Sequence, residues 1–264
     1  MRILSQNPLL HGRLGLKAVS LVGVGCLCGS CAKFPANSGA NFTAITVTFT
    51  VAGQINPNYI YDVALAPYDV PNPTLTGAPL IVINGTNNPN GRMAGSPCEF
   101  VEYPSPAGIN SATPFALYQF ATAAQTGGNT NGNPINLAVY STSQLGVITN
   151  FTTPQTGGPT NQLSFTIYTN ELTAADGATG KKLQSMQLNI MTMTRPSNLG
   201  SGARIIDGLG DDRNANGLNG FLQVNLLQSS PYTNANGFEP AGDTLGGTDP
   251  DIDIIDYTVT VSHP

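Results

Sequence analysis

Alternation of apolar and polar residues is the dominant pattern along residues 43–264, and it predicts β-strands. The clearest stretch is 45–51, where Ile45, Val47, Phe49 and Val51 alternate with threonines. A period of two with β-branched residues is typical of a strand that buries one face. Further strands are predicted at 59–66, 80–84, 99–103, 115–122, 135–141, 163–169, 183–194, 221–227 and 254–262.

The strand predicted at 183–194 has apolar residues on both faces. Met186, Leu188 and Ile190 fall on one face of an extended chain, whereas Met191 and Met193 fall on the other. We therefore expect the second half of this strand to be buried on both sides.

The connections between these strands are rich in Gly, Asn and Pro, as in 84–91 and 125–134. These residues supply positive φ angles or fixed turns. One short helix is predicted at 171–175, where Asn170 would cap its start and Gly177 would end it. About ten strands joined by such loops predict an all-β fold, an antiparallel β-sandwich.

Residues 1–31 have the composition of an export signal. Arg2, Arg13 and Lys17 precede an apolar run over 18–27, and small residues follow it. A positive flank, a short apolar core and a small-residue exit are the parts of a secretory signal peptide. The run is shorter than the ~20 apolar residues that span a bilayer. We expect a signal peptide at 1–31, a tether at 32–42 and an exported ectodomain at 43–264.

The small pair Gly29-Ser30 before Cys31 resembles the lipobox of bacterial lipoproteins. In that family the cysteine receives a lipid and becomes the mature N-terminus, which implies lipidation of Cys31 and a membrane anchor. The family prefers Leu three residues earlier, where this chain has Cys28. Cys26 is a second candidate, and ordinary cleavage after Ala32 is the alternative. The ectodomain itself resembles no characterised family.

The charge balance excludes some partners. The chain has 10 basic and 15 acidic residues, and three of the basic ones lie in the expected signal. The remainder therefore has 7 basic and 15 acidic residues, a formal charge of −8. Nucleic acids and anionic lipid surfaces require clustered Lys and Arg, so we expect neither as an electrostatic partner.

The sequence offers no catalytic group that we can assign. The histidines are His11, in the expected signal, and His263, next to the C-terminal residue, so a Ser-His or Cys-His pair is not predicted. Glu99 and Glu102 are three residues apart, which places them on opposite faces of a strand. We interpret both as solvated edge residues.

The acidic residues gather near the C-terminus, and one motif among them indicates a metal. Residues 212–217 read D-x-N-x-N-G, which resembles the first half of calcium loops of the EF-hand and dockerin kind. Position twelve is Gln223, so a bidentate Glu does not close the loop. A weaker calcium loop and an Asx-Gly turn without metal both remain open. The expected calcium ligands are Asp207, Asp211, Asp212, Asn214 and Asn216.

A second acidic group is Asp249, Asp251 and Asp253. In an extended chain these three carboxylates would share one face, where their repulsion would favour a cation or wide exposure to solvent. A solvated acidic edge that discourages strand pairing is the alternative.

Together these features predict an exported protein, lipid-anchored to a bacterial membrane in the cell envelope, with a non-catalytic binding, adhesion or structural role. Its partner would be an extracellular protein or a glycan, and calcium is the one cofactor expected. The alternative is a carboxylate-dependent enzyme that acts on an extracellular polymer such as a polysaccharide, which needs two acids facing one cleft. A subunit of a surface assembly is a third possibility.

Overall fold

The computed structural model describes residues 42–73, 79, 99–105, 108–119, 143–174, 182–195, 205–209, 220–235, 237–244 and 249–264. The chain divides into two units, Met1–Ala32 and Lys33–Pro264, and all described residues belong to the second. The expected signal peptide, Cys26 and Cys31 lie outside the described residues, as do the strands predicted at 80–84 and 135–141.

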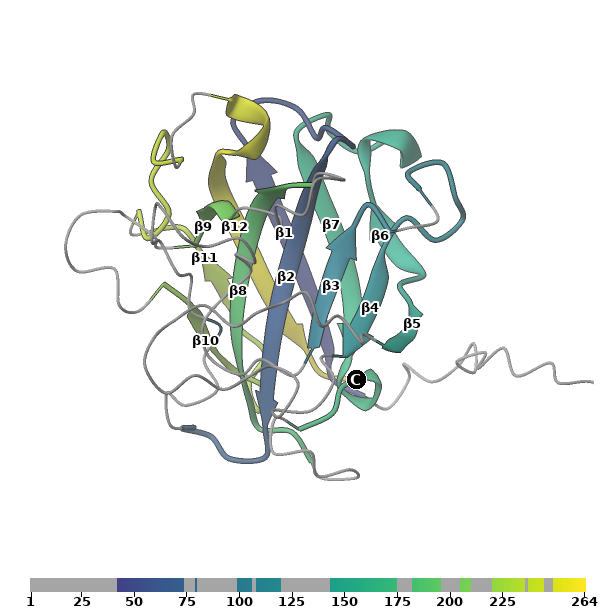
Figure 1. The fold of residues 1–264 in the computed structure, drawn as a ribbon. Helices are drawn as coiled ribbons and strands as arrows, with labels where there is room; N and C mark the ends of the chain where they lie inside the picture. The colour runs from purple at the N-terminus through teal and green to yellow at the C-terminus, as the bar shows by residue number, and fades with distance from the viewer. Residues whose placement is uncertain are drawn as a thin grey trace, which may run out of the picture. The chain divides into compact units, whose positions relative to one another are not determined.

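The described strands form two antiparallel sheets, which are the two layers of a β-sandwich (Figure 1). The five-stranded sheet has the order β11 (Pro231–Thr233), β12 (Ile254–Ser262), β1 (Ala44–Val51), β7 (Gln162–Tyr168) and β6 (Asn150–Thr152). The seven-stranded sheet has the order β10 (Leu222–Asn225), β8 (Ser185–Thr194), β2 (Tyr59–Tyr68), β3 (Glu99–Tyr103), β4 (Ala116–Gln119) and β5 (Ser143–Val147), and β9 (Ile205–Gly208) also pairs with β8. The predicted antiparallel sandwich is confirmed, with twelve strands in the described part of the chain where about ten were expected.

Strand β1 is central in its sheet and follows the predicted alternation. Its apolar residues are buried, while its threonines lie on the outer face and are partly exposed. Thr46 Oγ1 lies 2.9 Å from Thr166 Oγ1, and Thr48 Oγ1 lies 2.7 Å from Ser164 Oγ on the neighbouring β7. Polar residues on the solvent side therefore pair across the strands, and the apolar residues face the other sheet.

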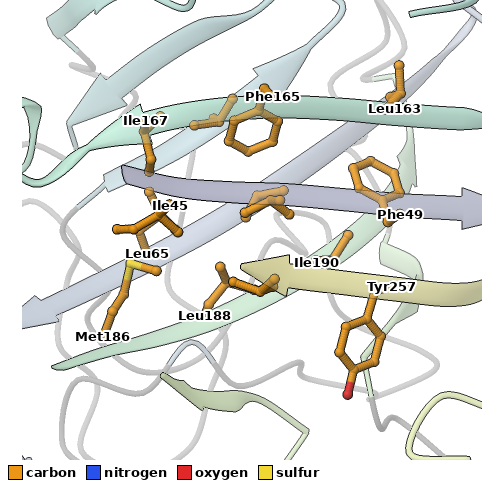
Figure 2. Close-up of a cluster of buried hydrophobic side chains, with 14 of the residues drawn as sticks. Ile45, Phe49, Leu65, Leu163, Phe165, Ile167, Met186, Leu188, Ile190 and Tyr257 are labelled. Atoms are coloured by element: carbon orange, nitrogen blue, oxygen red, sulfur yellow. The ribbon is translucent and has the colours of Figure 1, made fainter. Parts of the chain in front are cut away.

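The main core lies between the two sheets (Figure 2). Ile45, Phe49, Phe165 and Tyr257 enter it from the five-stranded sheet, and Leu65, Met186, Leu188 and Ile190 enter it from the seven-stranded sheet. Tyr61, Tyr103, Phe115 and Phe165 form a chain of aromatic contacts across this core, with ring centroids 4.9–6.1 Å apart. Such inter-sheet packing supplies most of the stabilisation of a sandwich.

Strand β8 is buried on both faces, as its sequence predicts. Residues 185–193 are all buried. Met186, Leu188 and Ile190 belong to the main core, while Met191 and Met193 pack with Ile60 and Ala64 in a second cluster. The parity of the residues places this second cluster on the outer face of the seven-stranded sheet.

Three sequence-based predictions were wrong in detail. In place of a helix at 171–175, a 3₁₀ turn, η4, spans Thr169–Glu171, and Leu172 after it is extended. Strands β5, β6, β9 and β11 were not predicted, because segments of three to five residues carry too little alternation to detect. Neither Glu99 nor Glu102 is an edge residue, because β3 lies between β2 and β4. The Glu99 side chain is 0% exposed, and Glu102 is partly buried.

Candidate metal centre

Asp207 connects the two sheets at one side of the sandwich. It lies on β9, opposite Thr192 of β8, and its side chain is fully buried. Its Oδ2 accepts a hydrogen bond of 2.6 Å from the backbone N–H of Ile254, the first residue of β12. Its Oδ1 accepts the N–H of Gly208 at 2.9 Å. The buried carboxylate therefore joins β9 of one sheet to β12 of the other.

The loop between β11 and β12 brings two more acids to Asp207. Asn234 shapes the first half of this loop, because its Oδ1 accepts the N–H of Glu239 and its Nδ2 donates to the carbonyls of Glu239 and Ile255. Gly237 has a φ of 62°, a conformation that a residue without Cβ adopts readily. The hydrogen bonds of Asn234 fix the backbone at Glu239, whose side chain is 2% exposed.

The second half of the loop is held by Asp253. Gly242, with a φ of 86°, donates its N–H to both carboxylate oxygens of Asp253, at 2.9 and 3.1 Å. Asp243 follows directly and is partly buried. Phe238 packs edge-on against Tyr257, with ring centroids 6.4 Å apart, and anchors the loop on the core. These contacts position Glu239 and Asp243 on the same side as Asp207.

The three carboxylates of Asp207, Glu239 and Asp243 converge. One oxygen from each lies within 4.8 Å of the others. We name this group the acidic triad. Two ligand oxygens on one calcium ion are at most about 5 Å apart, since each lies 2.3–2.6 Å from the ion. The spacing of the triad is thus compatible with three oxygen ligands of one hard cation.

Tyr257 reports the electrostatic environment beside the acidic triad. Burial and, to a lesser extent, the charges of Glu239 and Asp256 together raise the pKa of its hydroxyl to about 12. A phenol is harder to ionise near carboxylates because a second negative charge would form beside the first. The region around Glu239 therefore favours positive charge.

Of the five calcium ligands predicted from the sequence, the structure describes one. Asp207 was predicted as a ligand and belongs to the acidic triad, whereas Asp211, Asp212, Asn214 and Asn216 lie outside the described residues. Glu239 and Asp243 were not among the predicted ligands. Their one sequence signal was membership of the acid-rich C-terminal region, since the contact that brings them to Asp207 depends on the packing of β9 against β12.

The second acidic group does not form a shared face. Asp249, Asp251 and Asp253 flank or lie within a 3₁₀ turn, η5 (Pro250–Ile252), and not in an extended segment. Asp249 accepts the N–H of Asp251 and the hydroxyl of Tyr59. The extended arrangement that would have favoured a cation is therefore wrong, and each carboxylate accepts hydrogen bonds from a different part of the chain.

Asp251 is bonded to the turn that follows β1. Its Oδ1 accepts the N–H of Gln54 at 2.8 Å, and its Oδ2 accepts Asn56 Nδ2 at 3.0 Å. Gly53 lies so close that a Cβ there would come within 2.7 Å of the Pro250 carbonyl carbon. Asp251 thus connects η5 to the turn between β1 and β2.

Comparisons of the chain with protein-family models, curated proteins and solved structures find no match. Among the described residues, no helix has the length and apolar character needed to cross a membrane.

Proposed function

We propose that this chain is an exported protein of the bacterial cell envelope, anchored by a lipid on Cys31. Its β-sandwich acts as a non-catalytic module for binding, adhesion or structural display, with an extracellular protein or a glycan as partner. The observation that carries the non-catalytic role is the burial of the converging acids. Asp207 and Glu239 are 0% and 2% exposed, and Asp207 bonds the backbone of β12.

The burial of the acidic triad opposes the enzyme alternative. A carboxylate that protonates or attacks a polymer must contact the scissile bond, and glycosidases place two acids on either side of it. Two of the three triad residues are closed off from solvent. A polymer chain could not reach them without opening the joint between β9 and β12.

We further propose that the acidic triad binds calcium, which would stabilise the joint between the sheets. Buried carboxylates require a compensating positive charge or protons, because an uncompensated charge in a poorly solvated site is costly. The oxygen ligands and their spacing suit calcium. Arg204 and Arg213, close to Asp207 in the sequence but outside the described residues, are the rival source of positive charge.

Thermal unfolding with and without calcium tests the metal proposal. Millimolar calcium should raise the melting temperature of the wild-type protein, because a ligand that binds only the folded state stabilises it. Asp243→Asn should remove that gain, whereas Asp256→Asn, an exposed acid of β12, should keep it. No shift in the wild-type protein would assign the neutralising charge to a side chain and end the calcium proposal.

Mass spectrometry of the N-terminus of the native protein tests the anchor. We expect a mature chain that begins with acylated Cys31. An unmodified peptide that begins at Lys33 would instead indicate simple secretion. A polysaccharide hydrolysis assay adds a test of the non-catalytic role, since turnover that Asp243→Asn abolishes would favour the enzyme.

A further inference from the structure

A short segment closes one end of the sandwich. It consists of η4 and the three residues after it, residues 169–174, and we call it the strap. Leu172 packs against the main core, and Ala174 is buried within it. The N–H of Thr169 donates to the carbonyl of Thr43 at 3.0 Å, so the strap adjoins the start of β1, where the expected tether ends.

Glu99 lies beneath the strap. On β3 it shares the inner face with Val101 and Tyr103, which belong to the main core. Its Oε1 accepts the N–H of Thr173 at 2.8 Å. Its Oε2 is buried and receives no hydrogen bond from the residues that the structure describes. A buried carboxylate with one bonded oxygen is costly when ionised, and it is far less costly when protonated.

The groups around Glu99 offer it no positive charge within the described part of the chain. Leu65 of β2 and Gln119 of β4 lie opposite it in the sheet register. The strap contributes another acid, Glu171, whose Oε2 accepts the N–H of Tyr168 at 2.8 Å. Asp62 and Glu102 belong to the outer face of the sheet by parity, and the end of β7 carries the phenol of Tyr168.

The titration of Glu99 agrees with this geometry. Burial is the largest effect and raises the pKa of its carboxyl to about 7, while the bonds from Thr173 lower it. For Glu171, burial also raises the pKa, and the N–H of Tyr168 lowers it. Both acids of this end of the sandwich thus favour the protonated form more than an exposed glutamate does.

We propose that the strap is a pH-responsive closure, which packs over Glu99 while that side chain is protonated and loosens when it ionises. The closed strap keeps the Glu99 carboxyl away from water, and lifting Thr173 would hydrate it. Acid conditions therefore favour the closed end of the sandwich, and alkaline conditions favour an open one beside the tether. This inference depends only on the contacts of Glu99 and is independent of the lipid anchor and of calcium.

The direction and size follow from linkage. Closure raises the pKa of the Glu99 carboxyl from its ordinary value of 4.5 to about 7. The carboxyl therefore favours the closed strap fully at pH values below 4.5, and this stabilisation is lost as the pH rises to about 7. Each pKa unit of difference between the closed and the open state changes the equilibrium between them tenfold. The ratio of closed to open strap should therefore fall by up to about 300-fold over this pH range.

Two measurements on the wild-type protein test the closure. The ¹³C shift of the Glu99 side-chain carboxyl should titrate near pH 7, and a midpoint near 4.5 would overturn the proposal. Hydrogen exchange, corrected for the intrinsic pH dependence, should show the protection of the Thr173 amide falling between pH 5 and 8. The amide of Val47, in central strand β1, serves as the internal reference for global unfolding. Thr173 should be less protected than Val47 at every pH, and equal protection of the two amides would mean that Thr173 exchanges only by global unfolding and would refute a local closure.

Two variants separate the closure from a structural role of Glu99. Glu99→Gln keeps an acceptor for the Thr173 N–H but cannot ionise, so the protection of Thr173 should become independent of pH. Glu102→Gln, three residues along the same strand and on the opposite face, should titrate like the wild-type protein. If Glu99→Gln follows the wild-type pH profile, the proposal is wrong. If that variant does not fold, the carboxyl titration in the wild-type protein decides.

Discussion

The hydroxyl of Tyr61 supports three elements at once, and its removal should be costly. Tyr61 lies on the inner face of β2 and is 1% exposed. Its hydroxyl accepts the N–H of Asn56 and donates to the carbonyl of Asp251, both at 2.9 Å. It therefore holds the turn before β2 against η5.

Tyr61→Phe removes this oxygen and leaves the ring. Its contacts with Phe49 and Tyr103, at centroid distances of 6.3 and 6.1 Å, should persist. Two hydrogen bonds contribute about 1 kcal/mol each, and a backbone group left unpaired in a partly buried site adds to the cost. We expect the free energy of unfolding to fall by about 2–3 kcal/mol, a drop of several degrees in melting temperature for a domain of this size.

Tyr103→Phe is the matched control. It removes the hydroxyl of another buried core tyrosine, but that hydroxyl donates to the side chain of Gln155, which is exposed and can bond water instead. Its loss should cost no more than about 1 kcal/mol. Urea denaturation of the two variants measures the difference. If Tyr61→Phe lowers the free energy of unfolding by no more than Tyr103→Phe does, the assigned role of the Tyr61 hydroxyl is refuted.

Two further predictions concern packing and pH. Gly53→Ala should destabilise the protein by about 1–3 kcal/mol, because its Cβ would lie within 2.8 Å of the Asp251 backbone nitrogen, whereas Thr160→Ala in an exposed turn should change the melting temperature little. The free energy of unfolding should fall by up to about 3 kcal/mol as pH rises from 4.5 to above 7, since burial raises the pKa of Glu99 over that window. Urea denaturation at pH 5 and 8 measures this slope, and a Glu99→Gln variant with the same slope would contradict its origin.

The layer structure was accessible from the sequence because alternation is a local signal. The segment 45–51 alternates without a break, and β1 has the predicted faces. Residues 183–194 carry apolar side chains at adjacent positions, and β8 is buried on both sides. Strands β6 and β11 have three residues each, so their pairing with longer neighbours defines them rather than their own pattern.

The positions of the acids were not accessible in the same way. Glu99 has the local sequence of an edge residue, and only the placement of β3 between two strands makes it interior. The group at 249–253 would share one face if extended, but Pro250 starts a 3₁₀ turn, and Asp251 bonds the turn after β1, far away in the sequence. Local composition gave the charge of these segments but not their contacts.

The order of apolar and polar residues determined by itself that this chain forms an antiparallel sandwich and which side chains face its core. The tertiary structure alone decided that Asp207 meets Glu239 and Asp243 and that Glu99 lies under the strap. The physical reason is range: side-chain alternation acts between neighbouring residues, whereas the meeting of distant carboxylates depends on which strands pair and how the two sheets pack.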